Sequence, residues 1–232
     1  MPKPYFQLQQ SGQSADIYLF GDIVDDAYWG SETSPYSLVN QLNSLAPDVT
    51  EIALHIDCYG GSVSAGWGIY NTLRQKQGVT VRTYADGFVA SAAIYPFLAG
   101  KERFANSVSA FYFHPVLSGA YGYADDLRAE ADAIDKLTEI GRQALVDVAG
   151  LSQDAARELV DSKTWYSPQQ MLDMGIATAV TGRSTGDGAQ QSVRDGIIRQ
   201  LLAKPAVPGT PPDGPEKQPC ILQLFEKLVE KA

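Results

Sequence analysis

The stretch EIALHIDCYGGSVSAGWGIYNTLRQKQGVTVRTYA, residues 51–85, sets the fold class of this chain. Residues 51–57 have the apolar character of a buried strand, and a Gly-Gly turn follows them. Residues 64–77 then show the spacing of a helix, and residues 79–85 are again typical of a strand. A strand, a helix and a second strand in succession favour a sheet covered by helices, so the sequence predicts an α/β fold.

The same alternation extends on both sides of this stretch. Upstream, Ser34 and Pro35 have the residue types of an N-cap and a first helical position, which predicts a helix that they open. The complete set of further expected elements is strands at 6–9, 16–21, 102–105, 109–114 and 176–180, and helices at 34–45, 90–99, 124–149 and 167–175. These elements predict one domain over residues 1–182, a length that can bury a full core.

The composition changes beyond residue 182. Residues 183–219 are rich in Gly, Ser and Pro, which predicts a flexible linker with a short helix at 192–204. Residues 220–232, CILQLFEKLVEKA, have the pattern of an amphipathic helix. A helix at the end of such a tether either docks on a partner or folds back on its own domain.

Ser91 is the candidate nucleophile. It lies between a predicted strand and an apolar segment, and its neighbours Ala90, Ala92 and Ala93 are small. Small neighbours let a substrate backbone come close, and a strand-to-helix junction leaves amide N–H groups unpaired, as a nucleophilic serine requires. Taken alone, the segment favours a buried serine that bonds to a helix carbonyl.

Two further features support a catalytic role for this serine. His114 ends an aromatic, strand-like segment just before a proline, where an imidazole can serve as a general base. Gly60 and Gly61 lie between a strand and a helix, where their backbone N–H groups can hold a developing oxyanion. The other histidine, His55, lies within a buried strand and is predicted to be structural. The glycines match neither the dinucleotide-binding nor the phosphate-loop spacing.

Three segments, in this order along the chain, resemble the ClpP serine peptidases. They are CYGGSVSAG at 58–66, GFVASAA at 87–93 and FHP at 113–115. The likeness is greatest to the ClpP-related head maturation proteases of tailed phages and prophages. It implies a ClpP/crotonase-like fold of repeated ββα units, in which residues 124–149 form a long handle helix between two subunit rings.

The resemblance also implies the roles of single residues. Ser91 would be the nucleophile and His114 the general base. The oxyanion hole would consist of the backbone N–H groups of Gly60, Gly61 and Ala92. It implies no metal and no cofactor.

The third member of the triad departs from the family pattern. When the segment is anchored on Ser167 and Gly175, the family's aspartate falls on Lys163, and Asp161 lies two residues earlier. Asp161 can orient His114 after a small local shift. Alternatively, a backbone carbonyl or a water orients His114 in a Ser–His pair, or Lys163 assists as in the distantly similar signal peptide peptidases. Both charges can equally be solvated surface groups.

The resemblance implies an ATP-independent serine endopeptidase that cleaves phage capsid or scaffold proteins during prohead maturation. Two alternatives are an ATPase-partnered degradative peptidase and a catalytically silent ring subunit, the latter suggested by Lys163. A crotonase-type acyl-CoA enzyme shares the paired-amide oxyanion hole, but it needs no nucleophile, so Ser91 with His114 argues against it. The expected partners are peptide or protein substrates and further copies of the chain in homo-oligomeric rings.

Composition limits the remaining function classes. The 232 residues carry 18 basic and 27 acidic side chains, and the net charge of −9 argues against nucleic acid as a partner. Cys58 and Cys220 form neither a disulfide framework nor a metal pattern, and Cys58 is expected in the core. The absence of a signal pattern and of an apolar run of about 18 residues predicts no membrane contact and a cytoplasmic location, in the bacterial host or within phage proheads.

Overall fold

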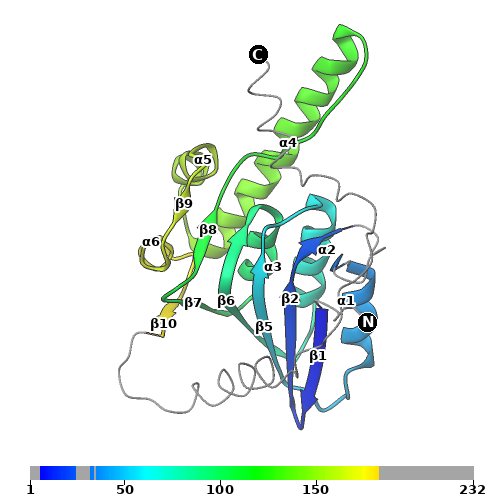
Figure 1. Ribbon diagram of the computed structural model, residues 1–232, viewed down its shortest axis with the longest axis vertical. Helices are drawn as coiled ribbons and strands as arrows, with labels where there is room; N and C mark the ends of the chain where they lie inside the picture. Colours follow the sequence, from blue (N-terminus) through cyan, green and yellow to red (C-terminus); the bar gives the residue numbers. More distant parts are fainter. Residues whose placement is uncertain (1–5, 25–31, 34, 183–232) are drawn as a thin grey trace, which may run out of the picture. The chain divides into compact units, whose positions relative to one another are not determined.

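The computed structural model describes residues 6–24, 32–33 and 35–182, which form strands and helices around one main sheet (Figure 1). The strands are β1 Phe6–Ser11, β2 Ser14–Phe20, β3 Asp22–Ile23, β4 Glu32–Thr33, β5 Glu51–Cys58, β6 Thr80–Ala90, β7 Glu102–Asn106, β8 Ala110–Tyr112, β9 Trp165–Tyr166 and β10 Ala179–Thr181. The helices are α1 Pro35–Ser44, α2 Val63–Arg74, α3 Ile94–Leu98, α4 Ala124–Ala149, α5 Gln153–Asp161 and α6 Pro168–Asp173, and a 3₁₀ turn covers Ser91–Ala93. The predicted linker and helices at 183–219, 192–204 and 220–232 lie outside the described residues.

The main sheet confirms the α/β prediction. Its strand order is β1-β2-β5-β6-β7-β10, and β1 pairs with β2 antiparallel while the other neighbours along this path are parallel. The long β6 changes partner along its length: residues 82–85 pair with β7, and residues 88–90 pair with β8. β8 also pairs antiparallel with β9, which connects the segment after α5 to the sheet.

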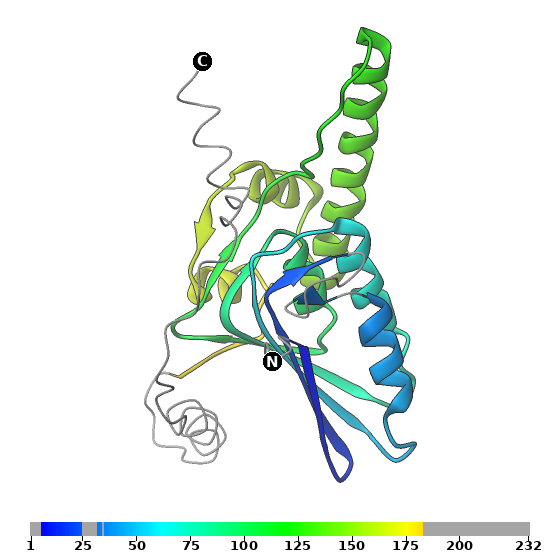
Figure 2. The ribbon, with the colours of Figure 1, turned by 45° about the vertical axis from the view of Figure 1, so that its right-hand side comes forward.

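Helices α1, α2 and α3 lie on one side of the sheet (Figures 1 and 2). The alternating burial of β5 shows why, because Ile52, Leu54 and Ile56 are buried in the core on that side. His55 lies on the opposite face, where its ring stacks between Tyr18 at 4.9 Å and Tyr84 at 4.8 Å. His55 therefore has the structural position that the sequence predicted.

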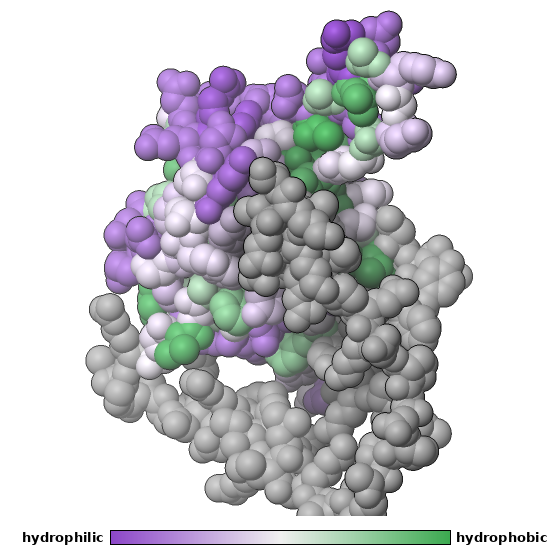
Figure 3. Space-filling model, turned by 45° about the horizontal axis from the view of Figure 1, so that its top comes forward, coloured by the Kyte–Doolittle hydropathy of each residue, from purple (hydrophilic) through white to green (hydrophobic). Residues whose placement is uncertain are grey.

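Helix α4 extends well beyond the sheet (Figures 1 and 2). It has 26 residues and ends at Gly150, whose φ of 71° suits a glycine C-cap. Its buried residues are Thr138, Gly141 and Leu145, which all belong to its C-terminal half. Three hydrophobic side chains of the helix, Leu127, Leu137 and Ile140, are nevertheless exposed, and Figure 3 shows hydrophobic residues among hydrophilic ones on this face of the molecule.

Several predicted boundaries are wrong: the helix expected at 64–77 ends at Arg74, the strand expected at 176–180 is Ala179–Thr181, and the largest error lies at residue 90. The sequence placed a helix at 90–99, whereas β6 continues to Ala90 and helix α3 begins only at Ile94. The strand is prolonged through an irregularity, because β5 advances from Ile56 to Cys58 while β6 advances from 85 to 89. Pairing with β8, a partner distant in sequence, keeps this last part of β6 extended.

A carboxylate fills the irregularity in β6. The Asp57 side chain accepts a hydrogen bond from the Phe88 N–H at 2.9 Å. A Cβ added to Gly87 would lie 2.3 Å from the same carboxylate, so this position requires glycine. The end of β6, and with it Ser91, is thus fixed from the neighbouring strand.

A buried arginine joins the end of the domain to the sheet. Arg103 on β7 is 7% exposed and donates to the carbonyls of Gly100, Gly175 and Ile176 at 3.0, 3.0 and 2.6 Å. Burial lowers the pKa of its guanidinium from the usual value.

In the described part of the chain, no helix is long and apolar enough to cross a membrane.

Candidate active site

Ser91 follows β6 directly and begins the 3₁₀ turn. Its φ of 55° is unusual for a residue with a side chain, and such strain persists only where the surrounding structure imposes it. Ala92 and Ala93 are buried, at 1% and 0% exposure, so the small neighbours noted in the sequence pack into the core. The Ser91 side chain itself is half-buried rather than enclosed.

The structure brings His114 to Ser91. β6 and β8 are parallel, with Ala90 opposite Tyr112, so both residues leave the sheet at the same edge. The Nε2 atom of His114 lies 2.8 Å from the Ser91 Oγ, a hydrogen-bond distance. The two residues singled out in the sequence therefore have the geometry of the nucleophile–base pair of a serine hydrolase.

The other ring nitrogen of His114 faces a backbone carbonyl. Its Nδ1 lies 2.6 Å from the Pro115 carbonyl oxygen. A carbonyl can only accept a hydrogen bond, so Nδ1 carries the proton in the neutral ring. Nε2 is then free of a proton and accepts the bond from the Ser91 hydroxyl, which is the tautomer that a general base needs.

The Gly-Gly turn lies against Ser91. Gly60 has a φ of 104°, and a Cβ added there would lie 2.6 Å from the Ser91 Cβ and 2.9 Å from the Ala92 nitrogen. Gly61 has a φ of 135°, and its Cβ would lie 2.0 Å from the Ile23 carbonyl oxygen. Both positions require glycine for conformation and for space.

The N–H of Gly60 has a partner of its own. It donates to the Cys58 sulfur at 3.2 Å, so this geometry does not support its predicted role as an oxyanion donor. Ala92, as the second residue of the helical turn, and Gly61 stay candidates. Burial raises the pKa of the Cys58 thiol to about 12, and the residue is 0% exposed, which fits the predicted core position rather than a nucleophile.

The structure does not bring Asp161 to His114. Asp161 ends helix α5, and its carboxylate accepts a hydrogen bond from Arg142 of α4. Arg142 also donates to Glu139 at 3.1 Å, and its side chain is only 12% exposed. The Asp161 carboxylate thus joins α5 to α4 in an ion pair.

Lys163 lies on the path toward β9. The antiparallel register pairs Phe111 with Tyr166 and Tyr112 with Trp165, and the pairing of β8 with β9 is limited to these residues. Lys163 is exposed and has a φ of 49°, so the strand does not continue through it. The position at which the family pattern has its aspartate thus holds an exposed lysine outside β9.

Aromatic residues that the sequence did not single out lie beside the Ser91–His114 pair. Phe88 stacks with Tyr59 at 4.8 Å and meets Trp165 at 5.3 Å, and Trp165 lies 5.0 Å from Tyr112. Tyr59, Phe88 and Trp165 are 59%, 38% and 45% exposed. No spacing signal could reveal this group, because its members come from four separate segments of the chain.

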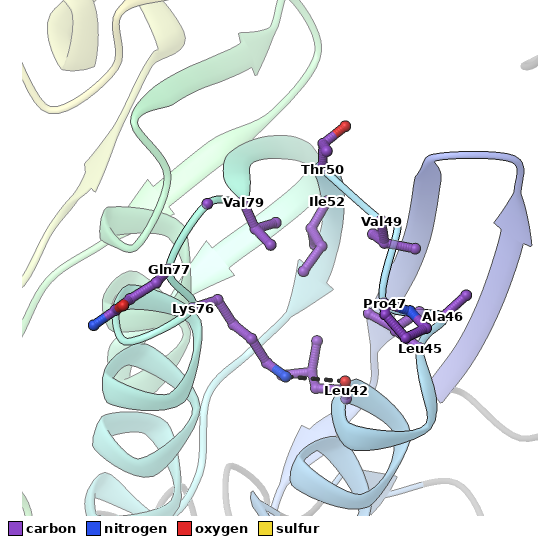
Figure 4. A pocket seen from close by; sticks show the side chains of 11 residues that line it. Leu42, Leu45, Ala46, Pro47, Val49, Thr50, Ile52, Lys76, Gln77 and Val79 are labelled. Carbon is purple, nitrogen blue, oxygen red and sulfur yellow. Dashed lines mark hydrogen bonds between the residues drawn. The ribbon is translucent and has the colours of Figure 1, made fainter.

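A cavity of about 350 Å³ lies elsewhere, where β5 and β6 begin (Figure 4). Lys76 reaches across it and donates to the Leu42 carbonyl at the end of α1, at 3.0 Å. Apolar side chains make up much of its lining, among them Leu45, Val49, Ile52 and Val79. Ser91 follows the opposite end of β6, so this cavity is separate from the Ser–His pair.

Comparison with known proteins agrees with this geometry. The family model described as Clp protease matches residues 29–184. The ATP-dependent Clp protease proteolytic subunit 2 of Parasynechococcus marenigrum is 33% identical over 132 residues, which cover 56% of this chain and 66%, just under two thirds, of that protein. The ATP-dependent Clp protease proteolytic subunit of Bacteroides fragilis is 33% identical over 166 residues, covering 71% of this chain and 78% of the relative.

The fold has a counterpart among solved structures. A mutant form of ClpP1 from Listeria monocytogenes superposes with a TM-score of 0.61 at 21% identity, over 75% of this chain and 93% of that one. This likeness confirms the predicted ClpP-type fold. The family model covers more than half of the sequence and includes Ser91, His114 and the Gly-Gly turn. The chain therefore belongs to the Clp protease family.

Proposed function

We propose that this chain is a serine endopeptidase of the ClpP type. The observation that carries the proposal is the 2.8 Å contact between the Ser91 Oγ and the His114 Nε2. The Gly60–Gly61 turn lies against the same serine and keeps side chains away from it. Family membership supports the same reaction class.

The geometry supports the following course of reaction. The Ser91 oxygen attacks a peptide carbonyl while its proton moves to the His114 Nε2, and a tetrahedral oxyanion forms. The N–H groups of Gly61 and Ala92 are the proposed donors to that oxyanion. The imidazolium then protonates the leaving amine, an acyl-enzyme remains on Ser91, and a water activated by His114 hydrolyses it.

A fluorophosphonate probe tests this proposal, because it reacts with activated serines. We expect one label per chain, located on Ser91 by mass spectrometry. Ser91→Ala should abolish the label, and His114→Ala should slow labelling by at least about 10²-fold, as expected for loss of a general base. A folded sample without any label would instead favour the catalytically silent subunit.

The ATP-independent capsid maturation function is the finer part of the proposal. It is supported by the resemblance of the motifs to phage head proteases, whereas the matched relatives are titled ATP-dependent proteolytic subunits. Incubation with an unfolded protein, without nucleotide or ATPase, separates the two. Cleavage of the long chain supports independent action in a bacterial host or prohead. Cleavage confined to short peptides supports an ATPase partner.

Assembly into rings through α4 is also proposed. The observation that supports it is the set of uncovered hydrophobic side chains Leu127, Leu137 and Ile140, which are 45%, 37% and 56% exposed. Because about half of each side chain is already covered, its burial between copies would stabilise an oligomer by roughly 0.5–1.5 kcal/mol. Light scattering should show a smaller assembly for Ile140→Glu than for the wild type. An unchanged mass would refute the role of this helix face.

A further inference from the structure

We propose that Thr138 on α4 is a positioning residue for the general base, acting through the Pro115–Val116 peptide, and that this peptide carbonyl takes the place of a triad carboxylate. The inference rests on the proposed peptidase function and deepens it. It assigns the third position of the catalytic triad to a backbone carbonyl, and it assigns the anchoring of that carbonyl to helix α4.

The contacts form one directed chain of hydrogen bonds. The Ser91 hydroxyl donates to the His114 Nε2 at 2.8 Å, and Nδ1–H donates to the Pro115 carbonyl at 2.6 Å. The Val116 N–H, in the same peptide group, donates to the Thr138 Oγ1 at 3.0 Å. The Thr138 hydroxyl donates in turn to the Ile134 carbonyl of α4 at 2.8 Å. Bonds aligned in one direction polarise one another.

The rigidity of the peptide group transmits the effect of Thr138. The peptide between Pro115 and Val116 is planar and trans, so its N–H and C=O point in opposite directions. Fixing the N–H on Thr138 therefore fixes the carbonyl on His114. Thr138 is only 5% exposed, and its hydroxyl is held by its own helix, so the anchor is well ordered.

The available carboxylate is committed elsewhere. Asp161 is paired with Arg142, whose side chain is only 12% exposed. Lys163, at the position where the family pattern has its aspartate, carries a cation instead of an acceptor. The Pro115 carbonyl is the acceptor that the structure places on Nδ1.

A neutral carbonyl performs part of a carboxylate's work. The carbonyl fixes the tautomer and the orientation of the His114 ring, as a carboxylate does. It stabilises the imidazolium less than an anion would. Catalysis then depends on the position of α4, because the second half of this helix carries the anchor. A shift of the helix would change the position of His114 relative to Ser91 through this chain of hydrogen bonds, without a direct contact between the helix and Ser91.

The test compares Thr138→Val with Thr138→Ser in the full-length protein, measuring the second-order rate of fluorophosphonate labelling from pH 5 to 9 together with thermal unfolding. Valine keeps the shape and removes the hydroxyl, so we expect about a 10-fold lower rate, corresponding to one lost hydrogen bond. Serine retains the hydroxyl and should restore the rate to within about 3-fold of the wild type.

Thr72→Val is the matched control, because the Thr72 hydroxyl donates to the Gly68 carbonyl of α2 at 2.8 Å in the same way. It should label at the wild-type rate. Asp161→Asn should also leave both the labelling rate and the dependence of that rate on pH unchanged. If Asp161 were the orienter, the amide would lower the rate by up to about 10⁴-fold.

Three results would overturn the inference. They are an unchanged rate in Thr138→Val, a serine variant as slow as the valine variant, and an Asp161→Asn variant that loses labelling while it stays folded. Failure of the proposed function has a different signature, because the wild-type protein itself would then not be labelled at Ser91.

Discussion

Replacement of Gly60 by alanine should both destabilise the fold and slow the reaction of Ser91. The added Cβ would lie 2.6 Å from the Ser91 Cβ, 2.7 Å from the Ala90 carbonyl oxygen and 2.9 Å from the Ala92 nitrogen. These separations fall roughly 0.5–0.8 Å short of ordinary van der Waals contact, so the turn and the serine must move apart. Two of the three clashing groups belong to the nucleophile and to a proposed oxyanion donor.

The magnitude follows from two separate costs. The φ of 104° is unfavourable for alanine by about 1–3 kcal/mol, and relief of the contacts adds a similar amount to the loss of stability. A displacement approaching 1 Å at the reacting groups lowers the rate by about 10²-fold. We therefore expect a folded protein with fluorophosphonate labelling of Ser91 reduced about 10²-fold.

Gly78→Ala separates the backbone cost from the contacts. Gly78 also has a positive φ, of 74°, but an added Cβ would meet nothing within 4 Å. This variant should lose about 1–2 kcal/mol of stability and label at the wild-type rate. Labelling rate constants and thermal unfolding of both variants give the comparison. Wild-type labelling in a folded Gly60→Ala protein would refute the close approach between the turn and the serine.

Further predictions concern the base, the core and the buried thiol. Lys163→Asp places a carboxylate where the family pattern has its aspartate, so labelling should become several-fold faster; a slower or unchanged rate would show that a carboxylate at this position does not reach His114. Arg103→Met leaves three buried carbonyls without their donor and should lower the free energy of unfolding in urea by about 3 kcal/mol, whereas a loss below about 1 kcal/mol would show that water replaces the guanidinium. The Cys58 thiol, with its pKa raised to about 12, stays protonated at pH 8, so in a Cys220→Ser background iodoacetamide should modify it only after unfolding; rapid alkylation of the native protein would contradict its burial.

Local sequence signals were sufficient for most of the framework. The alternating burial of β5 and the turn at Gly60–Gly61 depend on residues close in the chain, and both agree with the pattern of hydrophobic residues and glycines. The 26-residue α4 agrees with its predicted bounds, because its period and its glycine cap are local. The end of β6 was missed, since its extended form depends on pairing with β8, about twenty residues further along the chain.

The candidate site divides in the same way. Ser91 and His114 could be singled out because small residues around a serine and a histidine at a strand end are visible in the sequence, and the family order of the motifs strengthened the choice. Their 2.8 Å contact arises from the parallel pairing of β6 and β8. The Gly60 N–H was predicted to donate a hydrogen bond to the oxyanion because of its place in the turn. In the structure it donates to the Cys58 sulfur instead.

The residues 51–85 and the order of glycine turn, serine and histidine were enough to predict an α/β fold and a candidate nucleophile with its candidate base. Hydrophobic period and turn chemistry act over a few residues, so they can be read without coordinates. The partner of the His114 Nδ1 could not be predicted in this way, because the sequence left an aspartate, a lysine, a backbone carbonyl and a water as alternatives. Only the tertiary structure, which pairs Asp161 with Arg142 and anchors the Val116 N–H on Thr138, puts the Pro115 carbonyl in that place.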